Sequence, residues 1–185
     1  QDRQRASQAA DRLEWSGRWR MAVVTLDGRT AAGRAELRKA MVALRLAERR
    51  EGVWLRPDNL PADRLPDARR LADSQCEWHS AHPDGDDAEL AAALWDLDGW
   101  AETATELRRA VAGLTASVEA GDTGALAEGF VVSAAVLRHF QADPLLPDEL
   151  LPRGWPGSRL RADYDRYDHA YRGLLRQWLV GEDGG

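Results

Sequence analysis

The sequence predicts an α+β fold, in which a small ferredoxin-like α/β sandwich is followed by an all-α helical bundle. Over roughly the first ninety residues, short strand-like runs alternate with runs of helical period, which is the order of a small sandwich. After the PDGDD turn at residues 83–87 no strand pattern recurs, and apolar residues are spaced by four and three, as on one face of a helix. The two halves therefore differ in fold class.

The first strand and the first helix are both marked by turn or cap residues. WRMAVVTL, at residues 19–26, has the short, β-branched, period-two pattern of a strand, and Gly28 ends it. Helical period follows over residues 30–51, where Thr30 can cap the N-terminus. The apolar residues that share one face of this helix are Leu37, Met41 and Leu44.

Two further strands and a short helix complete the predicted sandwich. GVWLRP, at residues 52–57, is the second strand and is closed by its proline. A short helix opens at Pro66, where the missing N–H leaves no helical hydrogen bond unmade. CEWHSAH, at residues 76–82, is the third strand. Its alternation puts Cys76, Trp78 and Ser80 on one face and Glu77, His79 and Ala81 on the other.

Three long helices are predicted in the second half. The first begins at Asp98, a favourable N-cap, the second spans about 123–141, and the third about 158–180. We expect the tyrosines of the last helix in the core or at a dimer interface rather than as a platform for stacked bases. The three apolar stripes are Trp100, Ala104, Leu107, Val111, Leu114 and Val118; Leu126, Phe130, Leu137 and Phe140; and Leu160, Tyr164, Tyr167, Tyr171, Leu174 and Trp178.

The stretch DPLLPDELLPRGWPG, at residues 143–157, joins the last two helices. Its prolines restrict the backbone and so lower the entropy cost of ordering it. Asp143 precedes a proline and is therefore pushed out of helical geometry. We expect a rigid structural connector, with a binding loop as the alternative, in which Trp155 is a large anchor. The leucines expected to pin it onto the bundle are Leu145, Leu146, Leu150 and Leu151.

Composition and charge limit the function classes. The net charge is −6, whereas a chain whose main task is to grip a phosphate backbone is usually basic. No apolar run approaches the ~18 residues of a membrane span, and no secretory signal pattern is present. The single cysteine, Cys76, cannot form an internal disulfide. We therefore expect a cytoplasmic protein that does not contact a membrane.

Signals for catalysis and metal binding are weak. The sequence contains no phosphate-binding glycine loop, zinc-protease motif or nucleophile elbow. Cys76 and His79 fall on opposite faces of a strand, which disfavours a nucleophile–base pair. His79 and His82 precede three aspartates, but a solvated acidic turn explains that group better than a metal site. No catalytic residue, metal or cofactor is predicted.

Four motifs, in order, resemble the PaaX family of bacterial transcriptional repressors. WSGRWRMAVVTLD looks like the start of the family's central domain, and GVWLRP looks like its second strand. LWDLDGW, at residues 94–100, resembles the segment that opens the helical part, and DPLLPDELLPRGWPG resembles a signature of the family. The resemblance covers roughly Trp15 to Trp178.

The resemblance implies three parts. These are an N-terminal winged helix-turn-helix that binds operator DNA, a central ferredoxin-like domain, and a C-terminal helical domain used in dimerisation. On this scheme residues 1–14 are a linker or helix from a DNA-binding domain that is not in this chain, residues 15–86 are the central domain, and residues 87–182 are the helical dimerisation and effector domain. The implied macromolecular partners are operator DNA, through that N-terminal domain, and a second copy of the chain.

The resemblance also implies a non-enzymatic repressor of a catabolic operon, released by an acyl-coenzyme A effector such as phenylacetyl-coenzyme A. Because coenzyme A carries phosphates and an adenine, we expect arginines and an aromatic residue on or beside the predicted strands. The candidate ligand-binding residues are Arg18, Arg20, Trp54, Arg56 and His79.

Two alternative functions belong to other classes. Small CRISPR-associated nucleases of similar fold carry a metal-binding aspartate at the end of the first strand, where this chain has Asp27. An aspartate before Gly28 is also typical of a turn. The alternatives are therefore a metal-dependent, nuclease-like enzyme and a ligand-free dimerisation module.

Overall fold

The computed structural model describes residues 12–28 and 30–182 and confirms the predicted α+β fold class. The chain forms two compact units. The sheet unit comprises the residues up to Trp95 together with Pro144–Leu151, and the bundle unit comprises Asp96–Asp143 and the residues from Pro152 onward. The chain therefore passes from one unit to the other three times. None of the described helices is both long and apolar enough to cross a membrane.

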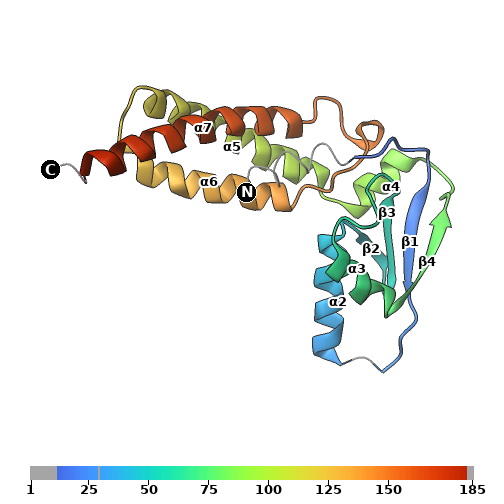
Figure 1. The fold of residues 1–185 in the computed structure, drawn as a ribbon. Coiled ribbons are helices and arrows are strands. Elements are labelled where there is room, and N and C mark those ends of the chain that lie inside the picture. The colour runs from blue at the N-terminus through green and yellow to red at the C-terminus, as the bar shows by residue number, and fades with distance from the viewer. Residues whose placement is uncertain (1–11, 29, 183–185) are drawn as a thin grey trace. The chain divides into compact units, whose positions relative to one another are not determined.

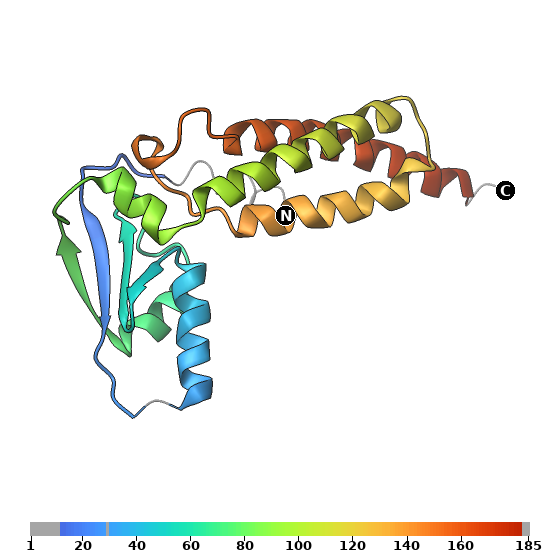
Figure 2. The same ribbon diagram turned by 180° about the vertical axis from the view of Figure 1, so that it is seen from behind.

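The sheet unit contains a four-stranded antiparallel sheet with two helices on one face. Its strands lie in the order β2-β3-β1-β4, the βαββαβ arrangement of a ferredoxin-like sandwich. Figure 1 shows α2 and α3 on the same side of the sheet, and the view from behind shows α2 again on that side (Figure 2). The elements in chain order are β1 (Trp19–Val24), α2 (Ala31–Ala43), β2 (Ala47–Arg50), β3 (Val53–Pro57), α3 (Pro66–Asp73) and β4 (Cys76–Ala81).

The sheet unit has its core between the sheet and those two helices. Thr30 Oγ1 accepts a hydrogen bond from Gly33 N at 3.1 Å, which confirms the predicted cap of α2. Pro66 occupies the first turn of α3, also as predicted. Antiparallel partners face the same side of a sheet, so the helix-covered face is built from residues paired across strands. The buried residues of this core are Ala22, Leu37, Met41, Leu46, Trp54, Ala72 and Cys76.

The prediction of one helix over residues 30–51 is wrong. α2 ends at Ala43, Arg45 takes a left-handed conformation with φ 64°, and β2 begins at Ala47. β2 reads AERR, an edge strand whose charged side chains replace the alternation that identifies a half-buried strand. Gly52, with φ 75°, permits the tight turn into β3. The sheet therefore has four strands where the sequence indicated three.

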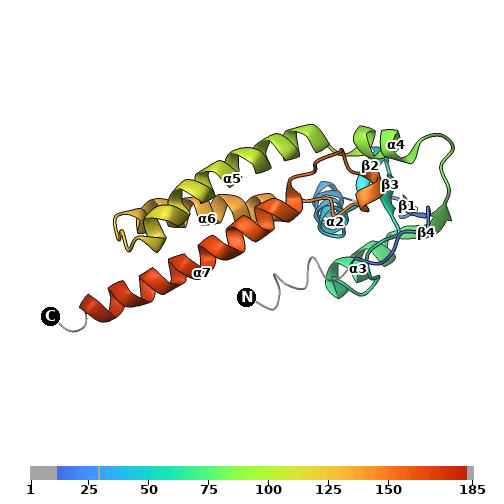
Figure 3. The same cartoon turned by 90° about the horizontal axis from the view of Figure 1, so that it is seen from above.

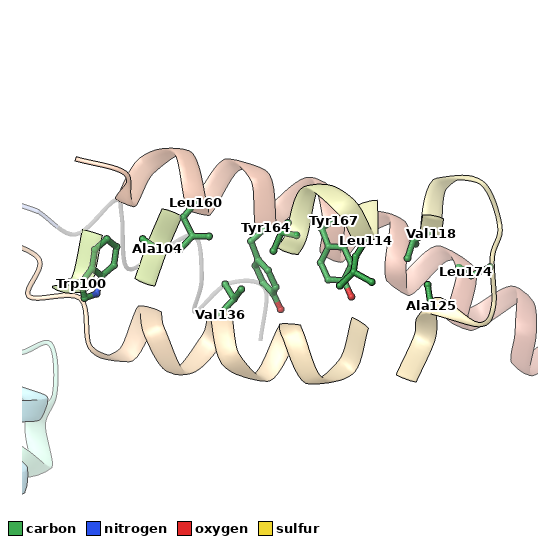
Figure 4. Packing of buried hydrophobic residues seen from close by; sticks show 11 residues of the cluster. Trp100, Ala104, Leu114, Val118, Ala125, Val136, Leu160, Tyr164, Tyr167 and Leu174 are labelled. Carbon is green, nitrogen blue, oxygen red and sulfur yellow. The ribbon is translucent and has the colours of Figure 1, made fainter. Parts of the chain in front are cut away.

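The bundle unit consists of three long helices that run side by side: α5 (Leu97–Glu119), α6 (Ala125–Gln141) and α7 (Gly157–Glu182) (Figure 3). Tyr164 and Tyr167 point from α7 toward α6 (Figure 4) and are fully buried, which confirms the expected core position of these tyrosines. The buried core residues are Trp100, Ala104, Val111, Leu114, Val118, Ala125, Val136, Leu160, Tyr164, Tyr167 and Leu174.

Three details of the predicted helical half need correction. A short helix, α4 (Asp87–Leu94), precedes the bundle, and α5 is capped by Asp96 rather than Asp98, since Asp96 Oδ1 accepts a hydrogen bond from Gly99 N at 3.0 Å. Phe130 is 67% exposed and Trp178 is 41% exposed, so these two members of the predicted stripes lie outside the core. The helical period identifies the apolar face of a helix, but it does not show which residues of that face are buried against another helix.

The leucine-rich connector packs differently from the prediction that it is pinned onto the bundle. Pro144–Leu151 is part of the sheet unit, and its short 3₁₀ turn, η1 (Asp148–Leu150), lies against α4 (Figure 1). Burial of a leucine side chain stabilises a fold by roughly 1.5–3 kcal/mol. The connector leucines that are fully buried are Leu145, Leu146 and Leu150.

Trp155 belongs to the bundle unit, as its predicted anchoring role requires. Its ring stacks on that of Trp100, with centroids 4.5 Å apart, and His139 stacks on the other face of Trp100 at 4.2 Å. The segment that the sequence presents as one connector is therefore divided, with Pro144–Leu151 on the sheet unit and Trp155 in the bundle.

Candidate functional site

An arginine-lined hollow lies in the sheet unit, and we call it the arginine hollow. β1 and β3 place Arg20 directly opposite Arg56, so both side chains rise from the helix-covered face of the sheet. The loop after β3 contributes Arg64, and α3 contributes Arg69. Asp58 is the one carboxylate among the described residues that line it. The remaining lining residues are Leu44, Leu46, Leu60, Pro61, Ala62, Leu65 and Trp78.

Arg56 is the most buried cation of the hollow, with 5% of its surface exposed. Its guanidinium donates to three neutral oxygens: the Pro57 carbonyl at 2.7 Å, the Leu44 carbonyl at 3.1 Å and Asn59 Oδ1 at 2.5 Å. Burial, and to a lesser extent the charge of Arg64, lowers the pKa of Arg56 to about 9. Arg56 is therefore still charged at neutral pH, and no carboxylate in the described part of the chain is hydrogen-bonded to it.

Trp78 forms an aromatic wall between two of the arginines. The Arg69 guanidinium carbon lies 4.0 Å from the centroid of the Trp78 ring, and that of Arg20 lies 5.6 Å away. Asp73 holds two of these groups, since its Oδ1 accepts from Arg69 Nε and from Trp78 Nε1, each at 2.7 Å. The ring and one guanidinium are thus fixed in place, whereas no carboxylate of the described chain bonds Arg20.

Size and charge together limit what the arginine hollow can bind. Its volume is about 50 Å³, whereas pockets that enclose a whole small molecule typically measure ~300–1,000 Å³. The hollow is therefore suited to one group of a ligand rather than to a complete cofactor. Arginine forks match the oxygens of phosphate and carboxylate, so the lining of the hollow is suited to an oxyanion, with the Trp78 ring beside it.

The five candidate ligand-binding residues are only partly gathered by the structure. Arg20 and Arg56 line the arginine hollow. Trp54 lines a separate hollow of about 610 Å³ beside α2, where Arg38 lies over its ring at 5.2 Å and also pairs with Glu48. Whether any of these residues binds a ligand remains a prediction.

Arg18 and His79 lie away from both hollows. Arg18 precedes β1 and is exposed, and its carbonyl accepts a hydrogen bond from Asp58 N at 2.9 Å. His79 pairs with Met21 and is exposed on the face of the sheet opposite to Arg20.

Sequence reasoning missed three residues of the arginine hollow: Arg64, Arg69 and Trp78. Trp78 had a usable signal, because its predicted alternation put it on the same strand face as Ser80, which pairs with Arg20. Arg64 and Arg69 lie in a loop and a short helix, and nothing in their spacing shows that they converge on β1 and β3.

The nuclease hypothesis depends on Asp27, which has no metal-binding partners among the described residues. β1 ends at Val24, so Asp27 lies in the exposed loop beyond the strand rather than at its end. Among residues 12–28 and 30–182, no group of three or more His, Cys, Asp or Glu side chains is close enough to hold a metal ion. In the acidic turn, Asp86 caps α4 by accepting from Glu89 N, and Asp87 accepts from Trp19 Nε1 at 2.8 Å.

Two family models match the chain and together cover most of it. One is described as the PaaX protein central Cas2-like domain and matches residues 12–87. The other is described as the PaaX-like protein C-terminal domain and matches residues 95–180.

Among solved structures, a similar chain is an uncharacterised protein, Rv0674, from Mycobacterium tuberculosis. The two chains are 37% identical with a TM-score of 0.75, over 94% of this chain and 68% of that one. No curated protein matches significantly.

Proposed function

Because the chain belongs to the PaaX-like family, which is a family of transcriptional regulators, we propose that it is the effector-sensing and dimerisation part of a repressor of a catabolic operon. In this proposal operator DNA is bound by an N-terminal winged helix-turn-helix domain outside the described residues, to which residues 1–14 lead. The protein acts in the cytoplasm, and the chain has no catalytic role.

The effector in this proposal is an acyl-coenzyme A thioester of the phenylacetyl type. The observation that carries it is the arginine hollow, where Arg20 and Arg56 lie opposite each other and no carboxylate of the described residues bonds either. We propose that one phosphate of the coenzyme lies in this hollow and that the rest of the ligand extends over the surface beside Trp78. The effector relieves repression by binding one state of the dimer better than the other, because a ligand shifts an equilibrium only through such a difference.

Calorimetric titration tests the effector proposal. The chain is titrated with phenylacetyl-coenzyme A, coenzyme A and phenylacetate in separate experiments. Micromolar binding of the thioester, with weaker binding of coenzyme A and none of phenylacetate, is the expected pattern. Absence of heat with all three ligands would remove the acyl-coenzyme A effector from the proposal.

A pair of arginine variants tests where the ligand binds. Arg20→Gln removes a guanidinium of the arginine hollow and should weaken thioester binding by about 10- to 100-fold, the usual effect of losing a charge-assisted hydrogen bond. The matched control is Arg49→Gln, since Arg49 is an exposed arginine of β2 that lines neither hollow of the sheet unit. Equal affinities of the two variants would place the ligand elsewhere.

We further propose that the chain forms a homodimer through the outer face of α6. Phe130 and Val131 are 67% and 66% exposed there, which leaves a large apolar surface on a helix. Glu128 and Arg138 lie near the two ends of this face, both exposed. An antiparallel, two-fold pairing of α6 with a second copy covers the apolar residues and places each glutamate near the arginine of the other copy.

Sedimentation equilibrium tests the dimer. Phe130→Asp should shift the chain to a monomer, because it puts a charge into the apolar face. Glu128→Arg and Arg138→Glu should each weaken the dimer, and the double variant should restore part of the affinity. If both single variants and Phe130→Asp sediment like the wild type, α6 is not the interface.

A further inference from the structure

Asn59 is a buried junction of three segments of the sheet unit. Only 1% of its surface is exposed. Its side-chain Oδ1 accepts from Arg56, and its Nδ2 donates to the Leu145 carbonyl at 3.0 Å. Its own backbone carbonyl accepts from Leu13 N at 2.9 Å. One residue thus bonds the arginine hollow, the leucine-rich segment Pro144–Leu151 and the segment that precedes β1.

The bond to Leu145 lies at a strained point of the backbone. Leu145 has φ 54°, in the left-handed region that bulky side chains rarely occupy, and it is buried to 99%. Such a conformation persists only where its surroundings impose it. Here the hydrogen bond from Asn59 and the burial of the leucine side chain act together on the same residue.

A second set of contacts joins the same two segments. Arg12 donates from one terminal nitrogen to the Leu146 carbonyl at 3.2 Å and to Asp148 Oδ1 at 3.3 Å. The residues that lead into β1 are therefore tied to Pro144–Leu151 both directly and through Asn59. The two ends of Pro144–Leu151 continue along the chain toward α6 and α7.

We propose that Arg56 and Asn59 form a relay by which an anion in the arginine hollow loosens the segment Pro144–Leu151. The inference rests on the proposed function for the identity of the natural ligand, but the relay itself requires only an oxyanion. The three described hydrogen bonds of Arg56 go to neutral oxygens, and an anion adds to such a bond the direct attraction between opposite charges.

The relay works through competition for one guanidinium. An anion that draws Arg56 away from Asn59 leaves the buried Oδ1 without its donor, so the Asn59 side chain must rearrange to be satisfied. Its bond to the Leu145 carbonyl is then weakened, and Leu145 is released from the left-handed conformation. The segment before β1 changes with Pro144–Leu151, because Arg12 bonds the Leu146 carbonyl and Asp148.

Hydrogen exchange tests the relay without any ligand. The reporters are the Leu150 and Leu151 amides, which donate to the Pro147 and Asp148 carbonyls. Arg56→Gln should speed their exchange by roughly 5- to 100-fold, the range expected for loss of a buried hydrogen bond, although Arg56 does not bond them. Arg56→Lys keeps the charge, cannot make all three bonds, and should act in the same direction.

Arg69→Gln is the matched comparison for that experiment. It removes a guanidinium from the same hollow, but Arg69 bonds Asp73 and has no bond to Asn59. In Arg69→Gln, the amides of Leu150 and Leu151 should exchange at the wild-type rate. Unchanged exchange in both Arg56 variants, with both folded by circular dichroism, would overturn the relay.

Pyrophosphate and phenylacetyl-coenzyme A are the two ligand probes. Each should speed exchange at Leu150 and Leu151 in the wild type. In Asn59→Ala, or in Asn59→Ser if the alanine variant does not fold, each probe should still bind but produce no further change. Binding in the wild type without an exchange response overturns the relay and leaves the effector proposal intact.

The two probes separate failure of the relay from failure of the proposed function. If pyrophosphate binds and speeds exchange while the thioester does not bind, the acyl-coenzyme A effector is wrong and the relay stands. If neither probe binds, the hollow takes no anion and the relay is wrong as well.

Discussion

The sheet unit and the bundle unit use arginine in different ways. In the bundle, Arg108 donates to Asp163 at 2.6 Å, and Arg166 forms two hydrogen bonds with Glu119 at 2.8 and 2.9 Å. Arg161 pairs with Asp143, whose side chain is almost fully buried. These pairs join α5 to α7, or α7 to the end of α6, so each charge is balanced within the fold.

In the arginine hollow, Arg69 is paired with Asp73, but the charge of Arg56 is not balanced in this way. Within residues 12–28 and 30–182, Arg56 bonds only neutral oxygens, and burial lowers its pKa to about 9. The comparison shows that these bundle arginines are paired with carboxylates, whereas Arg56 is buried against neutral oxygens, at the cost of a lowered pKa. The predictions below test this contrast, in order of decreasing effect.

The largest effect is expected for Trp100→Ala in the bundle. Trp100 is buried and stacks between His139 and Trp155, so its removal should lower the free energy of unfolding by about 3–5 kcal/mol. Trp78→Ala, at the half-buried wall of the hollow, should cost clearly less stability but weaken ligand binding. Urea unfolding followed by circular dichroism compares the two. Equal losses of stability would remove the distinction between architectural and ligand-facing tryptophans.

Close packing of α6 on α7 gives the next effect. A Cβ at Gly129 would lie 2.4 Å from Tyr167 Oη and 2.8 Å from Tyr171 Cε2, so Gly129→Ala should destabilise the bundle by about 1–3 kcal/mol. Gly173→Ala is the control, because a Cβ there meets no atom within 4 Å. That variant should gain up to ~1 kcal/mol from helix propensity. Two destabilised variants would mean that the clash is not the cause.

Anion-dependent stabilisation should be confined to the sheet unit. At a pyrophosphate concentration of ten times Kd, wild-type protein should gain about 1.4 kcal/mol of stability. Arg20→Gln should lose most of that gain, whereas Arg166→Gln, which breaks a paired arginine of the bundle, should keep it. Thermal unfolding with and without pyrophosphate measures both. A loss of the gain in Arg166→Gln would place the anion in the bundle.

The smallest effect concerns acid and the bundle. Burial lowers the pKa of His139, against smaller opposing contributions from its contact with Trp100 and the charge of Asp143. A lowered pKa in the folded state means that stability is present above the ordinary value of ~6.5 and is lost as pH falls through the lower folded value. The protein should unfold at a lower urea concentration at pH 5 than at pH 7, and His139→Phe should reduce the difference. An unchanged difference in that variant would assign the acid sensitivity to other groups.

The fold could be predicted further than the site because its signals are local. Thr30 marks the start of α2, and the four-and-three spacing from Trp100 to Val118 marks α5. β2 was missed because AERR is a charged edge strand without the alternation of a buried face. The arginine hollow depends on the register that sets Arg20 opposite Arg56 and on a loop that brings Arg64 to them, and neither is encoded in spacing along the chain.

Asn59 shows the same limit more sharply. In the sequence it follows Asp58 and precedes Leu60 and Pro61, as an asparagine in an ordinary turn would. Its importance comes from burial and from a partner, Leu145, that is 86 residues away in the chain. Hydrogen bonds of this range are set by tertiary structure alone, so only the structure identifies them.

The placement of Pro144–Leu151 also bears on how such proteins can evolve. A recombination break between residues 96 and 143 would deliver a sheet unit without the leucines that are buried in it, and a bundle interrupted by a segment with nowhere to pack. The sheet unit and the bundle unit are therefore not separable modules, even though separate family models match them. Exchange of domains with other proteins is therefore expected ahead of the sheet unit or beyond α7, and not between the two units.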